Sequence, residues 1–224
     1  GEGATTRVTG DTASLGRNLI IVSPGGDHNS GPGTTAPPFD VADAESIARE
    51  IPGVVAVAAV SSQLAVAVYG NANWPMSVLG TDNAYFDVRE WSVERGRVFD
   101  AGELQAGKAV CVIGATVALE LCGFQDPIGA SIRFHKLSCK VIGVLDARGQ
   151  SSFGQDQDDL IILPLRTFQR RLTGNQDVAL IFVSARSGQL TGKVQQDVTA
   201  LMRERRHIPP GQQGNFQVSD MKEI

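Results

Sequence analysis

The stretch from Lys108 to Leu165 decides the fold: KAVCVIGATVALELCG at 108–123, QDPIGASIRFHKLSCKVIGVLDARG at 125–149 and QSSFGQDQDDLIILPL at 150–165. Short apolar runs bounded by Gly and polar residues are typical of strands. We therefore expect strands at Val110–Ile113, Ile132–Phe134, Cys139–Val144 and Leu160–Leu163, the middle two joined as a hairpin through His135 and Lys136. A short helix is predicted at Ala115–Leu121, with Gly123 in the left-handed position after it, and Pro164 opens another helix. This part of the chain is mostly β.

Both ends of the chain carry the pattern strand, helix, strand. The N-terminal unit is predicted as a strand at Leu19–Val22, a long loop at Gly25–Pro38, a helix with Asp40 as N-cap that stops at Pro52, and strands at Val54–Val60 and Leu64–Val68. The C-terminal unit is predicted as a strand at Val178–Val183, an amphipathic helix at Leu190–Arg206 and a strand that starts at Phe216.

Two such units can pair into one sheet with both helices on one face, as in a split βαβ fold. The predicted fold class is therefore α+β, with two halves. Residues 1–84 and 166–224 form one discontinuous half, and residues 85–165 form an inserted, mainly β half.

Composition excludes several classes of protein. A net charge of −4, with 42% hydrophobic and 20% charged residues, is typical of an ordinary globular chain, and scattered Lys and Arg predict no nucleic-acid partner. No run approaches the roughly 20 apolar residues of a spanning helix, and Gly1–Gly10 does not resemble a signal peptide. We expect a soluble piece; if it belongs to a membrane protein, the spanning helices lie outside it.

The motifs that could carry chemistry favour structural roles. Alternate carboxylates at Asp156, Asp158 and Asp159 could converge on Ca²⁺, but they lack the other ligands of an EF-hand, and a solvated loop or carboxylate cap is favoured. Ser151 and Ser152 do not fit the GxSxG nucleophile pattern. No pattern places a histidine beside a nucleophile, as a catalytic triad requires; the histidines are His28, His135 and His207. The cysteines do not have the spacing of metal ligands; they are Cys111, Cys122 and Cys139. For Gly114, core packing is favoured over a phosphate-binding turn. We expect no catalytic residue, no metal and no cofactor.

Aromatic residues gather at 74–91, namely Trp74, Tyr85, Phe86 and Trp91. An exposed aromatic patch there could contact a partner or ligand. A hydrophobic hinge between the two halves is the favoured alternative.

Several segments taken in order resemble the extracytoplasmic domain of MacB-type ABC transporter permeases. They are SLGRNLIIVSPG, GVVAVAAV, LGTDNAYFDVREWSVERGRVF, VIGATVALELCG followed by DPIG, LSCKVIGVL, and SSFGQDQDDLIILPL. Each is weak alone, but the match covers nearly the whole chain in order. Cys122 and Cys139 stand where that family usually has Phe.

The resemblance implies a porter-like half made from both ends of the chain, placed between the first two membrane helices of a permease. It implies no chemistry in this domain, because a cytoplasmic ATPase domain or subunit hydrolyses ATP. The implied partners are the chain's own membrane helices, that ATPase, a second permease copy and a periplasmic adaptor. The implied role is to couple helix motion to export at the outer face of the membrane; the alternative is a stand-alone secreted ligand-binding or hydrolase-like domain.

Two further expectations rest on this resemblance. A loop with the residues Ser151, Ser152, Phe153, Gln155, Asp156 and Asp158 would contact the adaptor or the neighbouring copy, together with the hairpin tip at His135. Cys122 and Cys139 could form a disulfide in an oxidising compartment if their Cα atoms lie within about 7 Å; two packed free thiols are the favoured alternative.

Overall fold

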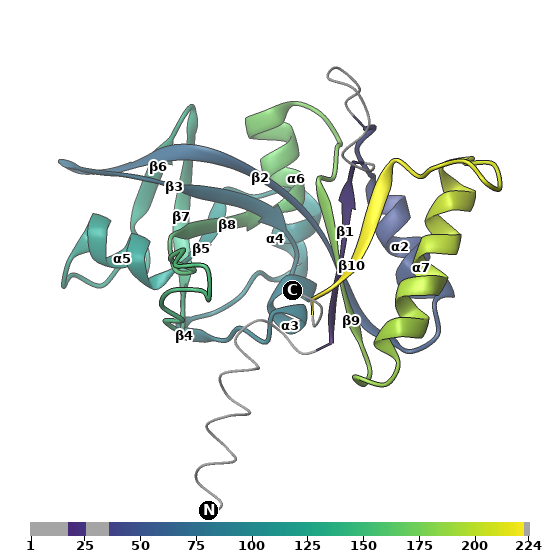
Figure 1. The fold of residues 1–224 in the computed structure, drawn as a ribbon. Coiled ribbons are helices and arrows are strands. Elements are labelled where there is room, and N and C mark those ends of the chain that lie inside the picture. The colour runs from purple at the N-terminus through teal and green to yellow at the C-terminus, as the bar shows by residue number, and fades with distance from the viewer. Residues whose placement is uncertain (1–17, 26–35, 222–224) are drawn as a thin grey trace, which may run out of the picture. The chain divides into compact units, whose positions relative to one another are not determined.

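The computed structural model describes residues 18–25 and 36–221, so most of the predicted loop at 25–38 lies outside the described residues. The chain divides into two compact units (Figure 1). Unit 1 comprises residues 1–60, 84–90 and 177–224, and unit 2 comprises residues 61–83 and 91–176. Among the described residues, none of the helices combines the length and the apolar character needed to cross a membrane.

Unit 1 is an antiparallel sheet built from both ends of the chain. Its strands are β1 (Leu19–Pro24), the first part of β2 (Val54–Tyr69), β9 (Leu180–Ala185) and β10 (Phe216–Asp220), in the spatial order β10-β1-β9-β2. Helices α2 (Val41–Glu50) and α7 (Thr191–Arg205) contact each other and lie on the same side of the sheet (Figure 1). The predicted pairing of the two terminal units in one sheet is confirmed.

Local chemistry explains why α2 begins and docks where it does. The Asp40 carboxylate accepts the Asp43 backbone N–H at 2.9 Å, and the Asp43 carboxylate accepts the Asp40 N–H at 3.1 Å, which is a complete capping box. The second Asp43 oxygen accepts from Nε of Arg205 on α7 at 2.7 Å. One carboxylate thus starts α2 and links it to α7.

Unit 2 is a closed strand barrel with short helices. Its strands follow the order β2-β3-β8-β5-β7, and β6 pairs with both β7 and β2, which closes the ring. The further elements are β3 (Ala72–Thr81), α4 (Ala101–Ala106), β5 (Val110–Ile113), α5 (Ala115–Cys122), β6 (Ser131–Phe134), β7 (Leu137–Leu145), β8 (Leu160–Pro164), α6 (Leu165–Phe168) and the π-helical turn η1 (Gln169–Thr173). A short strand, β4 (Val93–Gly96), adds to β7 outside the ring.

The barrel surrounds an apolar core. Side chains from the inward faces of its strands, including Ile132, Phe134, Leu137 and Ile161, are essentially inaccessible to solvent. Burial of this much apolar surface is the main favourable term in folding. The inserted half therefore has a core of its own.

The two compact units divide the chain at other positions than the predicted halves. Residues 61–83 belong to unit 2 because β2 is one 16-residue strand, not two, and its second part pairs with β3, which pairs with β8. Residues 166–176 also belong to unit 2, since Phe168 joins the barrel core. Conversely, α3 (Ala84–Val88) belongs to unit 1 because it packs on β9.

Strand β3 was not predicted, and it contains Pro75. Proline removes a backbone donor and is uncommon in a strand that pairs on both sides. Pairing between β3 and β8 begins only at Ser77, so Pro75 lies before the point at which the second ladder needs its N–H. The tertiary arrangement therefore tolerates a residue that argues against a strand.

Candidate functional site

The loop predicted to contact partners is a small antiparallel hairpin between β7 and β8. Gln150 and Asp156 form a β-bridge, the Ser151 N–H donates to the Gln155 carbonyl at 2.7 Å, and the Gln157 N–H donates to the Gly149 carbonyl at 2.9 Å. The Ser151 hydroxyl oxygen accepts the backbone N–H groups of residues 153 and 155, each at 3.3 Å. These contacts give Ser151 a turn-forming role.

Two carboxylates hold the base of this hairpin. Asp158 is 4% exposed and accepts the backbone N–H groups of Arg148 and Gly149 at 2.8 Å each. Asp156 accepts the Asp158 N–H at 2.9 Å and the Thr116 hydroxyl of α5 at 2.5 Å. Asp158 is therefore buried and bonded to the hairpin backbone, unlike the exposed residues predicted with it as a partner contact. Its carboxylate is needed to satisfy backbone donors.

The third carboxylate of the acidic stretch has a different partner. Asp159 accepts the indole N–H of Trp74 at 2.6 Å. Burial raises the pKa of Asp159 and the Asp156 charge adds to the increase, whereas the Trp74 hydrogen bond opposes it. Across residues 18–25 and 36–221, no three His, Cys, Asp or Glu side chains are grouped so that they could hold a metal ion.

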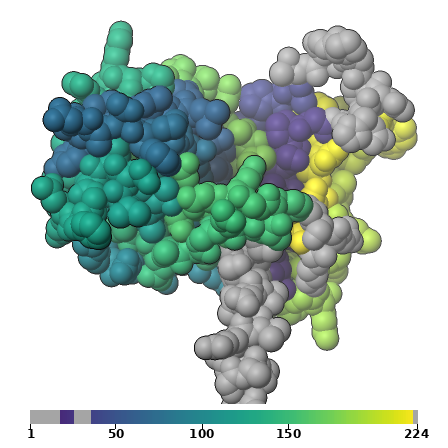
Figure 2. All heavy atoms as spheres, turned by 60° about the vertical axis from the view of Figure 1, so that its left-hand side comes forward, coloured from purple at the N-terminus to yellow at the C-terminus, as the bar shows by residue number. Residues whose placement is uncertain are grey.

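The hairpin carries one strongly exposed aromatic side chain. Phe153 is 77% exposed at the tip, and Ser152, Gln155 and Asp156 beside it are also exposed, while Ser151 is half-buried. The green segment around residue 150 lies at the surface of unit 2 that faces the viewer in Figure 2. The hairpin thus presents a large apolar group on a backbone fixed by hydrogen bonds.

The first residues of the hairpin are braced by Trp91. The Arg148 guanidinium carbon lies 4.5 Å from the centroid of the Trp91 ring, and the Trp91 indole N–H donates to the Asp146 carbonyl at 2.8 Å. A guanidinium over an indole face is an attractive arrangement. The carboxylate cap predicted for the acidic loop is present in Asp156 and Asp158. The Trp91 contacts are not visible as a motif, because Trp91 is far in sequence from Asp146 and Arg148.

The structure also describes the other predicted contact, the tip of the β6–β7 hairpin. His135 and Lys136 are exposed, and His135 adopts a positive φ of 53°. The Nε2 atom of His135 lies 3.1 Å from Nε2 of Gln63 on β2. His207 lies in unit 1, so these two histidines are in different units, and His28 lies outside the described residues.

The aromatic residues at 74–91 do not form an exposed patch. Tyr85, Phe86 and Trp91 are buried, and Trp74 is half-buried. In unit 1, Tyr85 packs against Phe182 with ring centroids 5.7 Å apart. These side chains serve packing, because aromatic rings bury large apolar areas.

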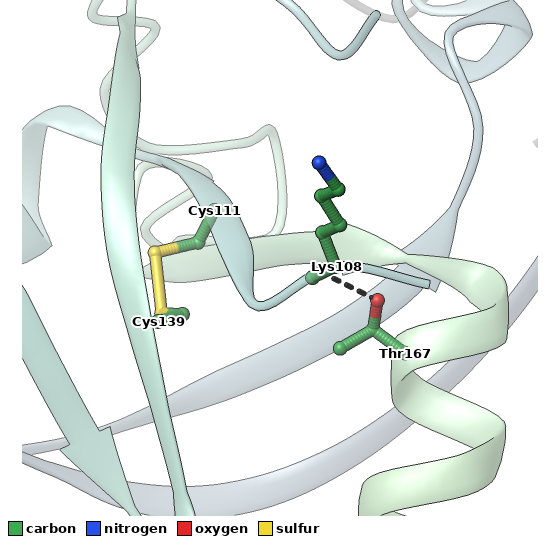
Figure 3. The surroundings of a disulfide bond; sticks show 4 residues. All are labelled: Lys108, Cys111, Cys139 and Thr167. Carbon is green, nitrogen blue, oxygen red and sulfur yellow. Dashed lines mark hydrogen bonds between the residues drawn. A yellow bond between two sulfur atoms is a disulfide. The ribbon is translucent and has the colours of Figure 1, made fainter. Parts of the chain in front are cut away.

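The predicted disulfide is wrong in one partner. The structure pairs Cys139 of β7 with Cys111 of β5, and their Cα atoms are 5.8 Å apart (Figure 3). Cys122, at the end of α5, is a buried free thiol. β5 and β7 are neighbouring parallel strands, so two inward side chains meet in the barrel core. Burial raises the pKa of the Cys122 thiol.

Close backbone packing explains Gly114. A Cβ atom at this position would lie 2.1 Å from the backbone oxygen of Asp158, and the Gly114 N–H donates to the Leu160 carbonyl at 2.9 Å. The core-packing interpretation of Gly114 is confirmed. In Figure 3, Thr167 of α6 donates its hydroxyl to the Lys108 carbonyl at 2.7 Å, which fixes the start of β5.

Comparison with known proteins identifies the fold and the family. The model of the MacB-like periplasmic core domain matches residues 1–201. The macrolide export ATP-binding/permease protein MacB of Bdellovibrio bacteriovorus is 34% identical over 228 residues, covering 100% of this chain and 35% of that protein. The MacB protein of Syntrophobacter fumaroxidans is 32% identical over 179 residues, covering 78% of this chain and 25% of that protein. The chain therefore spans about a third or less of the length of these relatives.

Two solved structures have the same fold as this chain. The periplasmic region of MacB from Actinobacillus actinomycetemcomitans has a TM-score of 0.78 at 18% identity, covering 97% of this chain and 95% of that one. The extracellular domain of the noncanonic ABC-type transporter YknZ from Gram-positive bacteria has a TM-score of 0.72 at 19% identity, covering 90% of this chain and 100% of that one. These structures share the fold, and the family model covers most of the sequence. The chain belongs to the family of MacB-like periplasmic core domains.

Proposed function

We propose that this chain is the extracytoplasmic part of an ABC transporter permease and couples ATP-driven motion of membrane helices to export of a substrate. One observation carries the proposal. β1, near the start of the chain, and β10, near its end, are neighbouring antiparallel strands in which Ile20 pairs with Asp220. The chain therefore enters and leaves unit 1 at adjacent positions.

This pairing would let motion of the membrane helices act directly on the sheet of unit 1. Paired residues in an antiparallel ladder have Cα atoms about 4.5–5.5 Å apart, so membrane helices at both ends would act on two strands that are already hydrogen-bonded. Helix α7 also packs on both β1 and β10. A change in helix spacing would therefore displace the sheet with α7, as in hinge or shear transitions.

The chain also links the two units without a loop at one point. Strand β2 contributes residues 54–60 to unit 1 and residues 61–69 to unit 2. We propose that this backbone link between residues 60 and 61 transmits motion of unit 1 to unit 2.

The proposed partners are a second permease copy, the ATPase domain or subunit and a periplasmic adaptor. The exposed Phe153 on its braced hairpin is the contact that we assign to the adaptor. An exposed aromatic ring on a preformed hairpin loses little conformational freedom on binding, and aromatic anchors often dominate interfaces. We also propose that the chain itself binds no nucleotide and catalyses no reaction.

Coupling is tested by cross-linking two copies in the full transporter. Single cysteines at exposed positions of unit 1, such as Val41→Cys, Val55→Cys and Gln196→Cys, are introduced with Cys122→Ser. A position near a two-fold axis cross-links to its own copy. We expect export to stop when the cross-link forms and to return when it is reduced, with ATPase activity measured in parallel. Unimpaired export by the cross-linked dimer would refute the coupling.

The adaptor contact is tested with Phe153→Ser. Phe124→Ser is the matched control, because Phe124 is also exposed in unit 2 but lies away from the hairpin in sequence. We expect Phe153→Ser to reduce co-purification of the adaptor while the control retains it. Equal retention by both variants would remove the hairpin from the interface, and loss of permease dimers instead would assign it to the second copy.

A further inference from the structure

A cleft lies on the outer surface of unit 2 where β2, β6 and β7 meet. It has a volume of about 350 Å³ and is lined by Val68, Tyr69, Gly70, Ser131, Arg133 and Ser138. β2 and β6 are paired at only one position, so the strand edges diverge beside it. This cleft is separate from the hairpin that carries Phe153.

The strand register places its polar groups side by side. Val68, Arg133 and Ser138 form one row across the three strands, and Ser131 lies opposite Lys140 in the next row. The intervening residues on β6 and β7, including Ile132 and Cys139, point into the core. Because side chains alternate along a strand, the guanidinium, the ammonium and both serine hydroxyls share the outward face.

Charge on these strands has one sign. The sequences of β2, β3, β6 and β7 contain no Asp or Glu, although the chain as a whole has a net charge of −4. Arg97 and Arg205 each pair with a buried carboxylate, whereas Arg133 has no ion-pair partner within the described part of the chain. A guanidinium beside hydroxyl donors matches the geometry of a carboxylate or phosphate.

An apolar strip leads to this cleft along β2. Leu64 is 79% exposed and Val66 is 51% exposed, and both share the outward face of β2 with Val68. Pro75 of β3, which is also exposed, lies opposite Val66. The blue residues of β2 and β3 form part of the surface turned to the viewer in Figure 2. The surface next to the cationic cleft thus carries a row of aliphatic side chains on β2, flanked by Pro75 and by the polar Asn73 and Ser77 of β3.

We propose that this cleft binds an anionic amphiphile. Its carboxylate or phosphate head accepts hydrogen bonds from Arg133, Ser131 and Ser138, and its aliphatic chain lies along Val68, Val66 and Leu64. Charge complementarity selects the head, and burial of the exposed side chains favours the chain. The inference does not depend on the coupling proposed above, so either can fail alone.

The test is a titration of the 224-residue chain followed by amide chemical shifts in NMR spectra. Decanoate and monodecyl phosphate supply both parts of the ligand, and the tighter of the two identifies the head group. Acetate and inorganic phosphate supply only the head, and decanol supplies only the chain. We expect shifts centred on residues 64–70 and 131–140, with the amphiphiles binding more tightly than either part.

Variants locate the site. Arg133→Gln should weaken amphiphile binding by about tenfold or more, since a hydrogen bond to a charged group is worth roughly that factor, and Arg133→Lys should retain part of the affinity. Arg171→Gln, at an exposed position in η1, is the matched control and should bind as the parent does. Leu64→Ser should weaken decanoate binding and leave acetate binding unchanged. Equal losses in Arg133→Gln and Arg171→Gln, or decanol binding as tightly as decanoate, would overturn the proposal.

Discussion

The two units of this chain are stabilised in different ways. Unit 1 is an open antiparallel sheet, with α2 and α7 linked by the Arg205–Asp43 ion pair. Unit 2 closes its strands into a ring around an apolar core and adds the Cys111–Cys139 disulfide within that core. An open sheet can shear along its edges, whereas a closed, cross-linked ring resists deformation. The comparison indicates that deformation should concentrate in unit 1.

Removal of the disulfide is expected to have the largest effect on stability among the changes that test this difference. In Cys111→Ala/Cys139→Ala, the bridge over a sequence separation of 28 residues is lost, and the chain-entropy relation predicts a loss of about 3–4 kcal/mol. Hydrogen exchange should show the loss in unit 2 amides, with unit 1 amides unchanged. Cys122→Ala is the control and should cost about 1 kcal/mol. Equal acceleration of exchange in both units would contradict independent stabilisation.

The second largest effect is expected at Gly114 in unit 2, where the backbone packs closely against Asp158. Gly114→Ala forces a Cβ atom against the Asp158 backbone oxygen, and we expect a loss of about 2–3 kcal/mol in the free energy of unfolding. The hairpin at 149–157 should also exchange faster, because Asp158 holds its base. Gly102→Ala in the exposed part of α4 is the control; its nearest neighbour is 3.4 Å away, and no loss is expected. A similar loss in both variants would place the effect outside this contact.

A loss of folding stability at low pH is also expected in unit 2. Arg97 donates to both oxygens of buried Glu103, at 2.7 and 3.0 Å, and this holds the Glu103 pKa at about 2, below its ordinary 4.5. Because the pKa is lower in the folded state, this contribution is present above about pH 4.5 and is lost as the pH falls toward 2. Arg97 is half exposed, so solvent screening reduces its size.

We expect Glu103→Gln to lower the free energy of unfolding by about 1–2 kcal/mol at pH 7. The difference from the parent should shrink at pH 3, as measured by urea unfolding. Asp126→Asn, which removes an exposed pair with Arg95, is the control and should have little effect at either pH. A difference for Glu103→Gln that grows as the pH falls would contradict a lowered pKa of Glu103 in the folded state.

The smallest effect is expected in unit 1. Asp43→Ala removes the hydrogen bond to the Asp40 N–H, which is one half of the capping box of α2, and the ion pair with Arg205, with an expected loss of about 1 kcal/mol. Arg205 is partly exposed and can turn to water, so no buried charge is left unpaired. Asp197→Ala removes only an exposed pair with Lys193 and should cost about 0.3 kcal/mol. Thermal unfolding of unit 1, followed by exchange of β1 and β10 amides, would measure both.

Elements whose signals are local were predictable from sequence. The N-cap at Asp40, the strand at Val110–Ile113 and the hairpin through His135 all appear in the structure as predicted. Each depends on residues within a few positions of one another, so hydrophobic periodicity and turn chemistry suffice. The ordered set of family segments likewise indicated the family that the family model shows.

Features that depend on distant residues were decided by the tertiary structure. Cys111 and Cys139 meet only because β5 and β7 are neighbours, Pro75 is tolerated only because the β3–β8 ladder starts at Ser77, and Asp158 is buried only because the hairpin folds over it. Sequence specified the residue types, including three cysteines and an acidic loop. Which cysteine pairs, and which carboxylate caps backbone instead of facing a partner, follow from strand adjacency, and no local pattern encodes the adjacency of strands far apart in sequence.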